Sequence, residues 1–135
     1  MVVVERVGAI APQLFIEVLR RSGLAERRPA DDPARIAKML ANSNLLVAAH
    51  DAETGELVGV ARSVTDFAYC CYLSDLAVDR AYQGQGIGQR LIEVTRQEAG
   101  PQAMCLLLSA PQAESFYEGI GMPRSANAFM FPRES

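Results

Sequence analysis

Alternating apolar and polar positions divide the first third of the chain into a strand and two helices. Residues 2–7 form a β-branched run that predicts a first strand. Residues 11–21 carry apolar residues at helical spacing, and Gly23 follows as a stop signal. Acidic residues before Pro33, which stands in the first turn, predict the start of a second helix.

The middle of the chain reads as a hairpin followed by a buried strand. Residues 45–49 and 57–64 are apolar runs, and the polar, glycine-containing segment 51–56 between them predicts a tight turn. Residues 68–78 are apolar at both odd and even positions. That pattern is typical of a central strand covered on both faces.

The last third predicts two further helices and two further strands. Residues 86–99 show one apolar helical stripe, and residues 103–108 read as a strand. A short helix over 112–118 and a final strand over 128–131 complete the pattern. The order β-α-α-β-β-β-α-β-α-β, without a linker or repeat, predicts one mixed α/β domain over residues 1–135 with its sheet between helices.

Composition narrows the classes of function. Half of the 135 residues are hydrophobic, which excludes a wholly disordered chain. The net charge of −3 argues against a nucleic-acid partner, and no apolar run is long enough for a membrane span. The first residues lack the basic region of a signal peptide, so we expect a cytoplasmic protein with reduced thiols at Cys70, Cys71 and Cys105. A single histidine and the absence of a CxxC spacing argue against a metal site.

The segment from Leu76 to Leu91 carries the candidate chemistry. A buried strand runs into a glycine-rich turn, and that turn opens a helix. Exposed loop amides and a helix N-terminus together form an anion site. The spacing fits neither the P-loop nor the dinucleotide fingerprint, because the P-loop lysine is missing and Gln89 stands where the fingerprint needs its third glycine. The plainer alternative is a tight strand-to-helix turn without a ligand.

Two signatures resemble the GCN5-related N-acetyltransferase (GNAT) superfamily. Gln83-x-x-Gly86-x-Gly88 matches its acetyl-CoA motif, [RQ]xxGx[GA]. Downstream, a strand is followed by a helix with Tyr117 and Gly121 at the family's spacing, although Met122 replaces the common phenylalanine. The element order also matches. The resemblance implies a mostly antiparallel central sheet flanked by helices and splayed open where the cofactor lies.

The resemblance also implies where acetyl-CoA is held, without a metal. The strand edge before the loop would pair with the pantetheine arm through Leu76, Ala77 and Val78, and the Leu76 N–H would polarise the thioester carbonyl. The loop amides would hold the pyrophosphate; these belong to Gln83, Gly84, Gln85, Gly86, Ile87 and Gly88, with Gln89 at the start of the helix.

The implied reaction is direct attack of a primary amine on the thioester, with two proton transfers. Tyr117 matches the family's general acid and contacts the cofactor; a core aromatic is the alternative. Tyr72 and Ser74 occupy the positions where several members carry a base, and neither residue is a good base. We hypothesise Asp75, which strict alternation places on the opposite face unless a bulge intervenes. An ordered water is the alternative.

Other interpretations remain open at this stage. The missing base favours an acyl-CoA-binding sensor without turnover, and an acetyltransferase acting on protein or charged tRNA is a third class. Residues 20–38 hold six basic and three acidic residues, which indicates either an anionic acceptor site or two solvated helices. The acceptor is unidentified. The apolar residues Phe129 to Phe131 favour a homodimer or a last strand within one chain.

Overall fold

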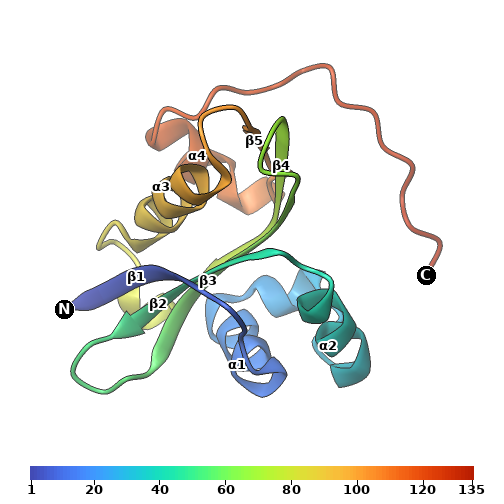
Figure 1. Cartoon of the computed structure of the whole chain (residues 1–135). Helices are drawn as coiled ribbons and strands as arrows, with labels where there is room; N and C mark the ends of the chain where they lie inside the picture. Colours follow the sequence, from blue (N-terminus) through green and yellow to red (C-terminus); the bar gives the residue numbers. More distant parts are fainter.

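The computed structural model describes all of residues 1–135 and contains one five-stranded sheet in the order β1-β2-β3-β4-β5 (Figure 1). All neighbouring strands are antiparallel except β4 and β5, which run parallel. The strands are β1 (Val2–Val7), β2 (Leu45–Asp51), β3 (Leu57–Thr65), β4 (Cys70–Val78) and β5 (Met104–Leu106). The mixed, largely antiparallel sheet predicted from the sequence is confirmed.

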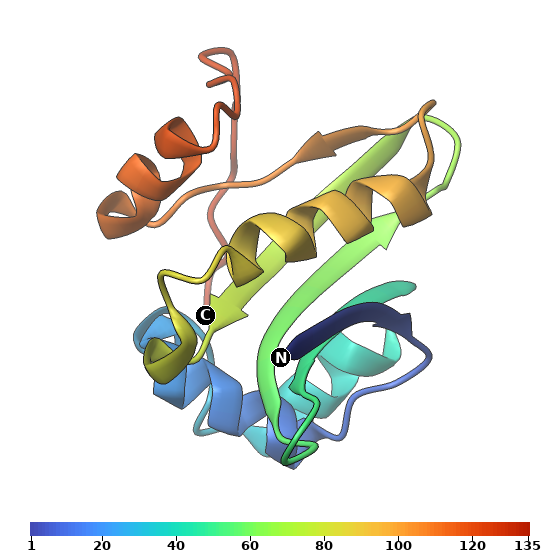
Figure 2. The same cartoon turned by 90° about the vertical axis from the view of Figure 1, so that its left-hand side faces the viewer.

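Helices cover both faces of the sheet (Figure 2). The elements are α1 (Pro12–Ser22), α2 (Pro33–Ala41), α3 (Ile87–Ala99) and α4 (Glu114–Gly119), with short 3-10 turns η1 (Leu24–Arg27), η2 (Arg80–Tyr82) and η3 (Pro111–Ala113). Helices α1 and α2 lie on one face, and α3 lies on the other. None of the four helices combines the length and the apolar character that a membrane crossing needs.

Two separate cores hold the layers together. On one face, Phe15 and Leu19 of α1 pack with Ile36 of α2 against the sheet, all at 0% exposure. On the other face, Leu91 of α3 packs against strand residues that include Leu73. Burial of each such side chain stabilises the fold by about 1.5–3 kcal/mol. The two cores together hold the helices in place against the sheet.

Helix boundaries follow the signals in the sequence. The Asp32 carboxylate accepts a hydrogen bond from the Arg35 N–H at 3.1 Å and caps the start of α2. Gly23 ends α1 in the left-handed region at φ 89°, and its N–H donates to the Arg20 carbonyl. The abrupt end of α1 turns the chain back toward the sheet through η1.

A β-bulge in β4 changes which face its residues occupy. Arg62 of β3 is paired with Asp75 and Ser63 with Leu73, so Ser74 is an extra residue with no partner in β3. Before the bulge, Leu73 packs into the core of α3. After it, Ala77 packs into the core of α1 and α2, two residues beyond Asp75. Asp75 therefore shares the α1–α2 face with Tyr72, against the expectation from strict alternation.

The C-terminal strand predicted over residues 128–131 is not formed, and that prediction was wrong. Residues from Met122 onward have no regular structure, and Phe129 and Phe131 are fully exposed. The parallel pairing of β4 with β5 spans only three residue pairs, and the tail is interrupted by Pro123 and Pro132. An isolated apolar run gains a strand conformation only from a partner strand, and the tail lies away from the sheet (Figure 1).

Candidate functional site

The glycine loop between β4 and α3 is held at both ends. The Asp79 carboxylate accepts from the Ala81 N–H at 2.9 Å, and the Tyr82 hydroxyl donates to Asp51 at 2.6 Å. Gly84 and Gly86 then adopt left-handed φ values of 83° and 78°. Side chains rarely adopt this conformation, so the backbone path requires glycine here.

The loop presents a continuous row of unpaired amides. No backbone N–H from Gly84 to Gln89 donates to a backbone carbonyl, and the first bond of α3 runs from the Arg90 N–H to the Gly86 carbonyl at 3.1 Å. The residues from Gly84 to Gly86 are exposed. Unpaired amides at the positive end of a 13-residue helix attract an anion, and a phosphate group fits that requirement.

Gly88 has a packing role beside its place in the motif. A Cβ built at this position would lie 2.9 Å from Cζ of Phe116. The Phe116 ring of α4 therefore rests directly on the first turn of α3. The rings of Phe116 and Tyr117 meet edge-on, with their centroids 5.1 Å apart. The contact with α3 therefore brings Tyr117 close to the glycine loop.

The β4 edge beside the loop is open. Strand β5 pairs only with Cys70 to Tyr72, so the rest of β4 has no neighbour on that side. The Asp79 N–H donates to the Val58 carbonyl of β3. Since amides alternate sides along a strand, those of Leu76 and Val78 point to the open side. The sheet is thus splayed at the position expected from the resemblance.

Tyr117 lies partly buried against the core of α3. Burial raises the pKa of the Tyr117 hydroxyl above its ordinary value, and the nearby positive charge of Arg28 partly offsets that rise. The hydroxyl is therefore protonated at neutral pH, as a general acid must be. Arg28 follows η1, so the electrostatic contact links the α1–α2 side of the sheet to α4.

Asp75 is fully buried between two arginines. Arg28 Nε donates to Oδ1 and Arg62 Nε donates to Oδ2 of the carboxylate, which has no exposed surface. Arg28 also donates to the Ser74 carbonyl at 2.7 Å, and Arg62 donates to the Ser74 hydroxyl at 2.9 Å. An incoming amine cannot reach Asp75 in this arrangement, although the bulge turns it to the α1–α2 face.

The other two candidate positions offer no base either. Tyr72 is 38% exposed, and the Ser74 hydroxyl is occupied by Arg62. The structure thus places the loop amides, the open edge of β4 and Tyr117 around one region, and it withdraws Asp75 beneath them. Sequence reasoning missed the two arginines, although a charged residue inside an apolar strand is generally buried only with a partner.

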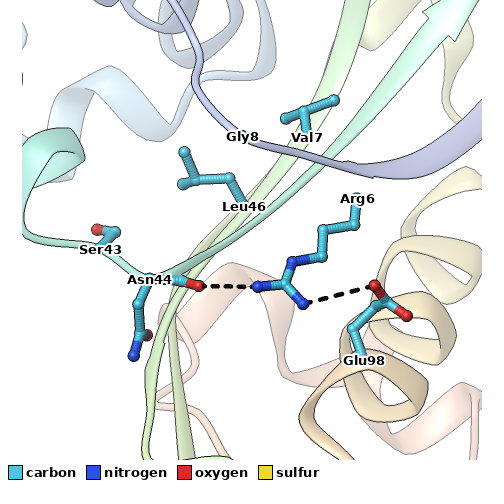
Figure 3. A pocket seen from close by; sticks show the side chains of 7 residues that line it. All are labelled: Arg6, Val7, Gly8, Ser43, Asn44, Leu46 and Glu98. Atoms are coloured by element: carbon cyan, nitrogen blue, oxygen red, sulfur yellow. Dashed lines mark hydrogen bonds and ion pairs between the residues drawn. The ribbon is translucent and has the colours of Figure 1, made fainter.

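A polar hollow of about 410 Å³ lies at the other end of the sheet, between β1, β2 and α3. Figure 3 shows the Arg6 side chain between the Asn44 carbonyl and the Glu98 carboxylate, at 3.4 Å and 3.7 Å. None of the residues of the glycine loop lines this hollow. No group of three or more His, Cys, Asp or Glu side chains is arranged to hold a metal ion.

Comparison with known proteins places this geometry in context. The family model of the acetyltransferase (GNAT) domain matches residues 41–121. A histone acetyltransferase of Glycine max is 30% identical over 109 residues, which covers 70% of this chain and 45% of that protein. The chain therefore spans about half the length of the curated relatives it matches.

Solved structures share the fold along almost the whole chain. A probable acetyltransferase from meticillin-resistant Staphylococcus aureus superposes with a TM-score of 0.79 at 19% identity, covering 98% of this chain and 99% of that one. An aminoglycoside N-acetyltransferase in complex with CoA gives a TM-score of 0.72 at 13% identity, with coverage of 100% and 96%.

Proposed function

This chain belongs to the GNAT acetyltransferase family, and we propose that it transfers an acetyl group from acetyl-CoA to a primary amine. The observation that carries the proposal is the row of unpaired amides from Gly84 to Gln89, directly beside the open edge of β4. Together they offer an anion cradle for a pyrophosphate and a strand edge for an amide-containing pantetheine arm. The solved CoA complex of similar fold supports the same ligand.

In the proposed reaction the residues of this chain orient the thioester and move one proton. The Leu76 N–H at the open edge donates to the thioester carbonyl oxygen, which becomes negatively charged as the amine nitrogen attacks the carbonyl carbon. The carbon–sulfur bond then breaks, and the Tyr117 hydroxyl gives its proton to the departing thiolate. The attacking nitrogen loses its extra proton to solvent.

Asp75, first hypothesised as the base, is better suited to a positioning role. Its carboxylate is buried and engaged by Arg28 and Arg62, so we propose that it orients these arginines while an ordered water accepts the amine proton. Arg28 retains partial exposure, with 23% of its side chain accessible. It is thus the most accessible member of the ion-paired cluster for an acceptor.

Arg28 also suggests an acceptor class. The two arginines and Asp75 together carry one net positive charge below the bulge, and Arg28 uses only part of its five N–H donors. The neighbouring Arg20 and Arg21 instead pair with exposed acids on the surface. We propose an acceptor amine that bears a carboxylate, for which a guanidinium is a bidentate partner.

Calorimetric titration with acetyl-CoA and CoA tests the cofactor assignment. Gly86→Glu places a carboxylate among the loop amides and should weaken CoA binding by at least about tenfold, because like charges repel at short range. Gly55→Glu is the matched control: Gly55 also has a left-handed φ, 74°, and open space around its Cβ, but lies in the β2–β3 turn. Equal binding by both variants, or none by the unmodified protein, would refute the assignment.

Measurement of turnover distinguishes an acetyltransferase from an acyl-CoA-binding sensor. The lack of an accessible base on β4 favours the sensor. Thiol release is measured with three classes of amine: amino acids, lysine peptides and polycationic aminoglycosides. We expect turnover to be fastest with carboxylate-bearing amines, and Arg28→Gln to lower kcat/KM for these alone by about tenfold or more. Arg20→Gln, at an exposed position, is the control. Tight CoA binding without any thiol release would establish the sensor.

We also propose that the chain forms a homodimer through its exposed tail. The tail residues Phe129, Met130 and Phe131 are 98%, 67% and 102% exposed. Burial of such an apolar run against a second copy is more favourable than its exposure to water. Sedimentation of the full chain and of a Phe129→Ser/Phe131→Ser variant distinguishes the two states. A monomeric full chain at micromolar concentration would refute the dimer.

A further inference from the structure

Two thiols face each other where β5 joins β4. Cys71 and Cys105 are direct partners in the parallel register, and both are free cysteines. Paired strands lie about 4.7–4.9 Å apart, and a disulfide needs Cα atoms about 4.4–6.8 Å apart. Both side chains turn to the α3 face, where Cys71 belongs to the core and Cys105 packs against it. The pair therefore has the spacing and direction that a disulfide requires.

The position of the pair in the sheet means that a bond between the two cysteines would affect the splay between β4 and β5. Only three residue pairs join β4 to β5, and Cys71–Cys105 is the middle one. The splay begins after the next pair, Tyr72–Leu106. A covalent bond at Cys71–Cys105 would thus fix the closed end of the opening that receives the pantetheine arm in the proposed function.

Small molecules reach the pair from one side. Cys71 is 1% exposed, whereas Cys105 is half-buried and lines a hollow of about 270 Å³ between α3, β5 and the segment after α4. Arg96 of α3 also lines this hollow. An anionic or peroxide oxidant thus has a path to the sulfur of Cys105.

The surroundings stabilise a thiolate. The S–H of Cys105 lowers the pKa of Cys71 to about 6 against the opposing effect of burial, and the Ser63 hydroxyl lowers this pKa further. The pKa of Cys105 is raised in turn, because its proton is held by the Cys71 sulfur. Ser63 Oγ is the one buried side-chain polar atom without a hydrogen-bond partner, and a thiolate supplies the acceptor it lacks. Cys71 is thus the more acidic of the two thiols.

We propose that Cys71 and Cys105 form a redox-active dithiol that hydrogen peroxide converts to an interstrand disulfide. The Cys105 sulfur, which the hollow reaches, attacks one peroxide oxygen as its proton passes to the Cys71 thiolate; the O–O bond breaks, and a sulfenic acid on Cys105 and hydroxide form. The second sulfur attacks the sulfenic sulfur and displaces its oxygen as water. Two thiols and one peroxide thus give one disulfide and two waters, and a dithiol reductant reverses the change.

The proposed consequence, which rests on the proposed function, is control of acetyl-CoA binding. A disulfide prefers Cα atoms about 5.5–6 Å apart, whereas paired strands lie about 4.7–4.9 Å apart, so its formation shifts β5 relative to β4. The closed end of the splay then changes its width. We expect the oxidised protein to bind CoA at least about threefold more weakly than the reduced protein, with full recovery after reduction.

The first test counts thiols after peroxide treatment of the native chain. The unmodified protein has three free cysteines and should retain one, with a mass loss of 2 Da and a cross-linked peptide containing Cys71 and Cys105. Cys70→Ser, which leaves the pair intact, is the matched control and should still lose both thiols. Cys105→Ala should show no intramolecular disulfide. Oxidation rates of Cys70→Ser should rise with pH around a midpoint near 6.

Each result decides between the proposal and its alternatives. A cross-link through Cys70, an equal 2 Da loss in Cys105→Ala, or resistance of all three thiols would overturn the dithiol. CoA titration of the Cys70→Ser protein, reduced and oxidised, then tests the control of binding. Equal affinities would overturn the control but leave the dithiol. Absence of CoA binding in both states would refute the proposed function while the thiol count still stands.

Discussion

Replacement of Asp75 by asparagine tests whether this carboxylate supports the fold or performs the chemistry. The side chain has no exposed surface, and its two oxygens accept from Arg28 and Arg62. Asparagine keeps the size and removes the charge. The cluster then holds two guanidinium groups without a counter-charge, and the cost of that change follows from how far each arginine can escape.

The two arginines differ in that respect. The Arg62 side chain is 10% exposed, so the loss of its charge-assisted hydrogen bond costs about 3 kcal/mol, near the upper end for such bonds. Arg28 is 23% exposed and can turn to water, which limits its loss to about 1 kcal/mol. The amide oxygen of asparagine returns about 1 kcal/mol through one neutral bond. We expect a net loss of about 3 kcal/mol, within the range for breaking a buried ion pair.

Urea unfolding of Asp75→Asn, Arg28→Met and Arg62→Met measures this directly. Each arginine variant leaves one neutral ion pair, so both should lose less stability than Asp75→Asn, and Arg28→Met the least. A loss under about 1 kcal/mol for Asp75→Asn would refute the buried-network reasoning. The pH profile of kcat/KM gives a second readout. If Asp75 is the general base, the profile of Asp75→Asn should lack its acid limb. If Asp75 is a positioning residue, the shape of the profile should not change.

Two further predictions concern titratable groups. Tyr117→Phe should lower kcat by about 100-fold and leave the affinity for CoA unchanged, measured by thiol release and calorimetry. Because burial raises the pKa of Tyr117, the unmodified enzyme should keep its acid form beyond the pH at which an ordinary tyrosine ionises. An unchanged kcat would assign Tyr117 to the core alone. The N–H groups of Cys70, Ala68 and Tyr69 lower the pKa of Asp66 to about 2. This depressed pKa gives stability that is present above about pH 4 and lost as the pH falls toward 2, so Asp66→Ala should flatten the acid-unfolding curve over that interval.

Much of the fold was predictable because its signals are local. Glycine at the end of α1, the cap at Asp32 and the helical stripe of α3 each act within a few residues, and the structure places these elements where the sequence predicts them. The glycine loop was predictable for the same reason. The tail strand over 128–131 was not, because a strand depends on a partner elsewhere in the chain and apolar alternation does not reveal whether that partner is free.

The part of the site that the sequence did not predict depends on contacts between residues that are distant in sequence. Arg28 lies 47 residues before Asp75, and Arg62 meets the same carboxylate from the neighbouring strand. A period-two pattern also conceals a bulge. The apolar residues at both parities predicted coverage on both faces, but Tyr69 and Tyr72 are exposed, and the exchange of faces at Ser74 was not predicted. For that reason Asp75 was assigned to the wrong face under strict alternation.

The extra residue at Ser74 makes the length of β4 as informative as its residues. A substitution there leaves the phase of the strand intact, whereas deletion of Ser74 would restore strict alternation. Leu73 and Asp75 would keep their opposite faces, because the residue pairs on either side of the bulge stay the same, but the strand would lose the Ser74 carbonyl and hydroxyl that accept from Arg28 and Arg62. A one-residue gap at this point in a relative therefore signals that the two arginines are held differently, even where every motif of the glycine loop is retained.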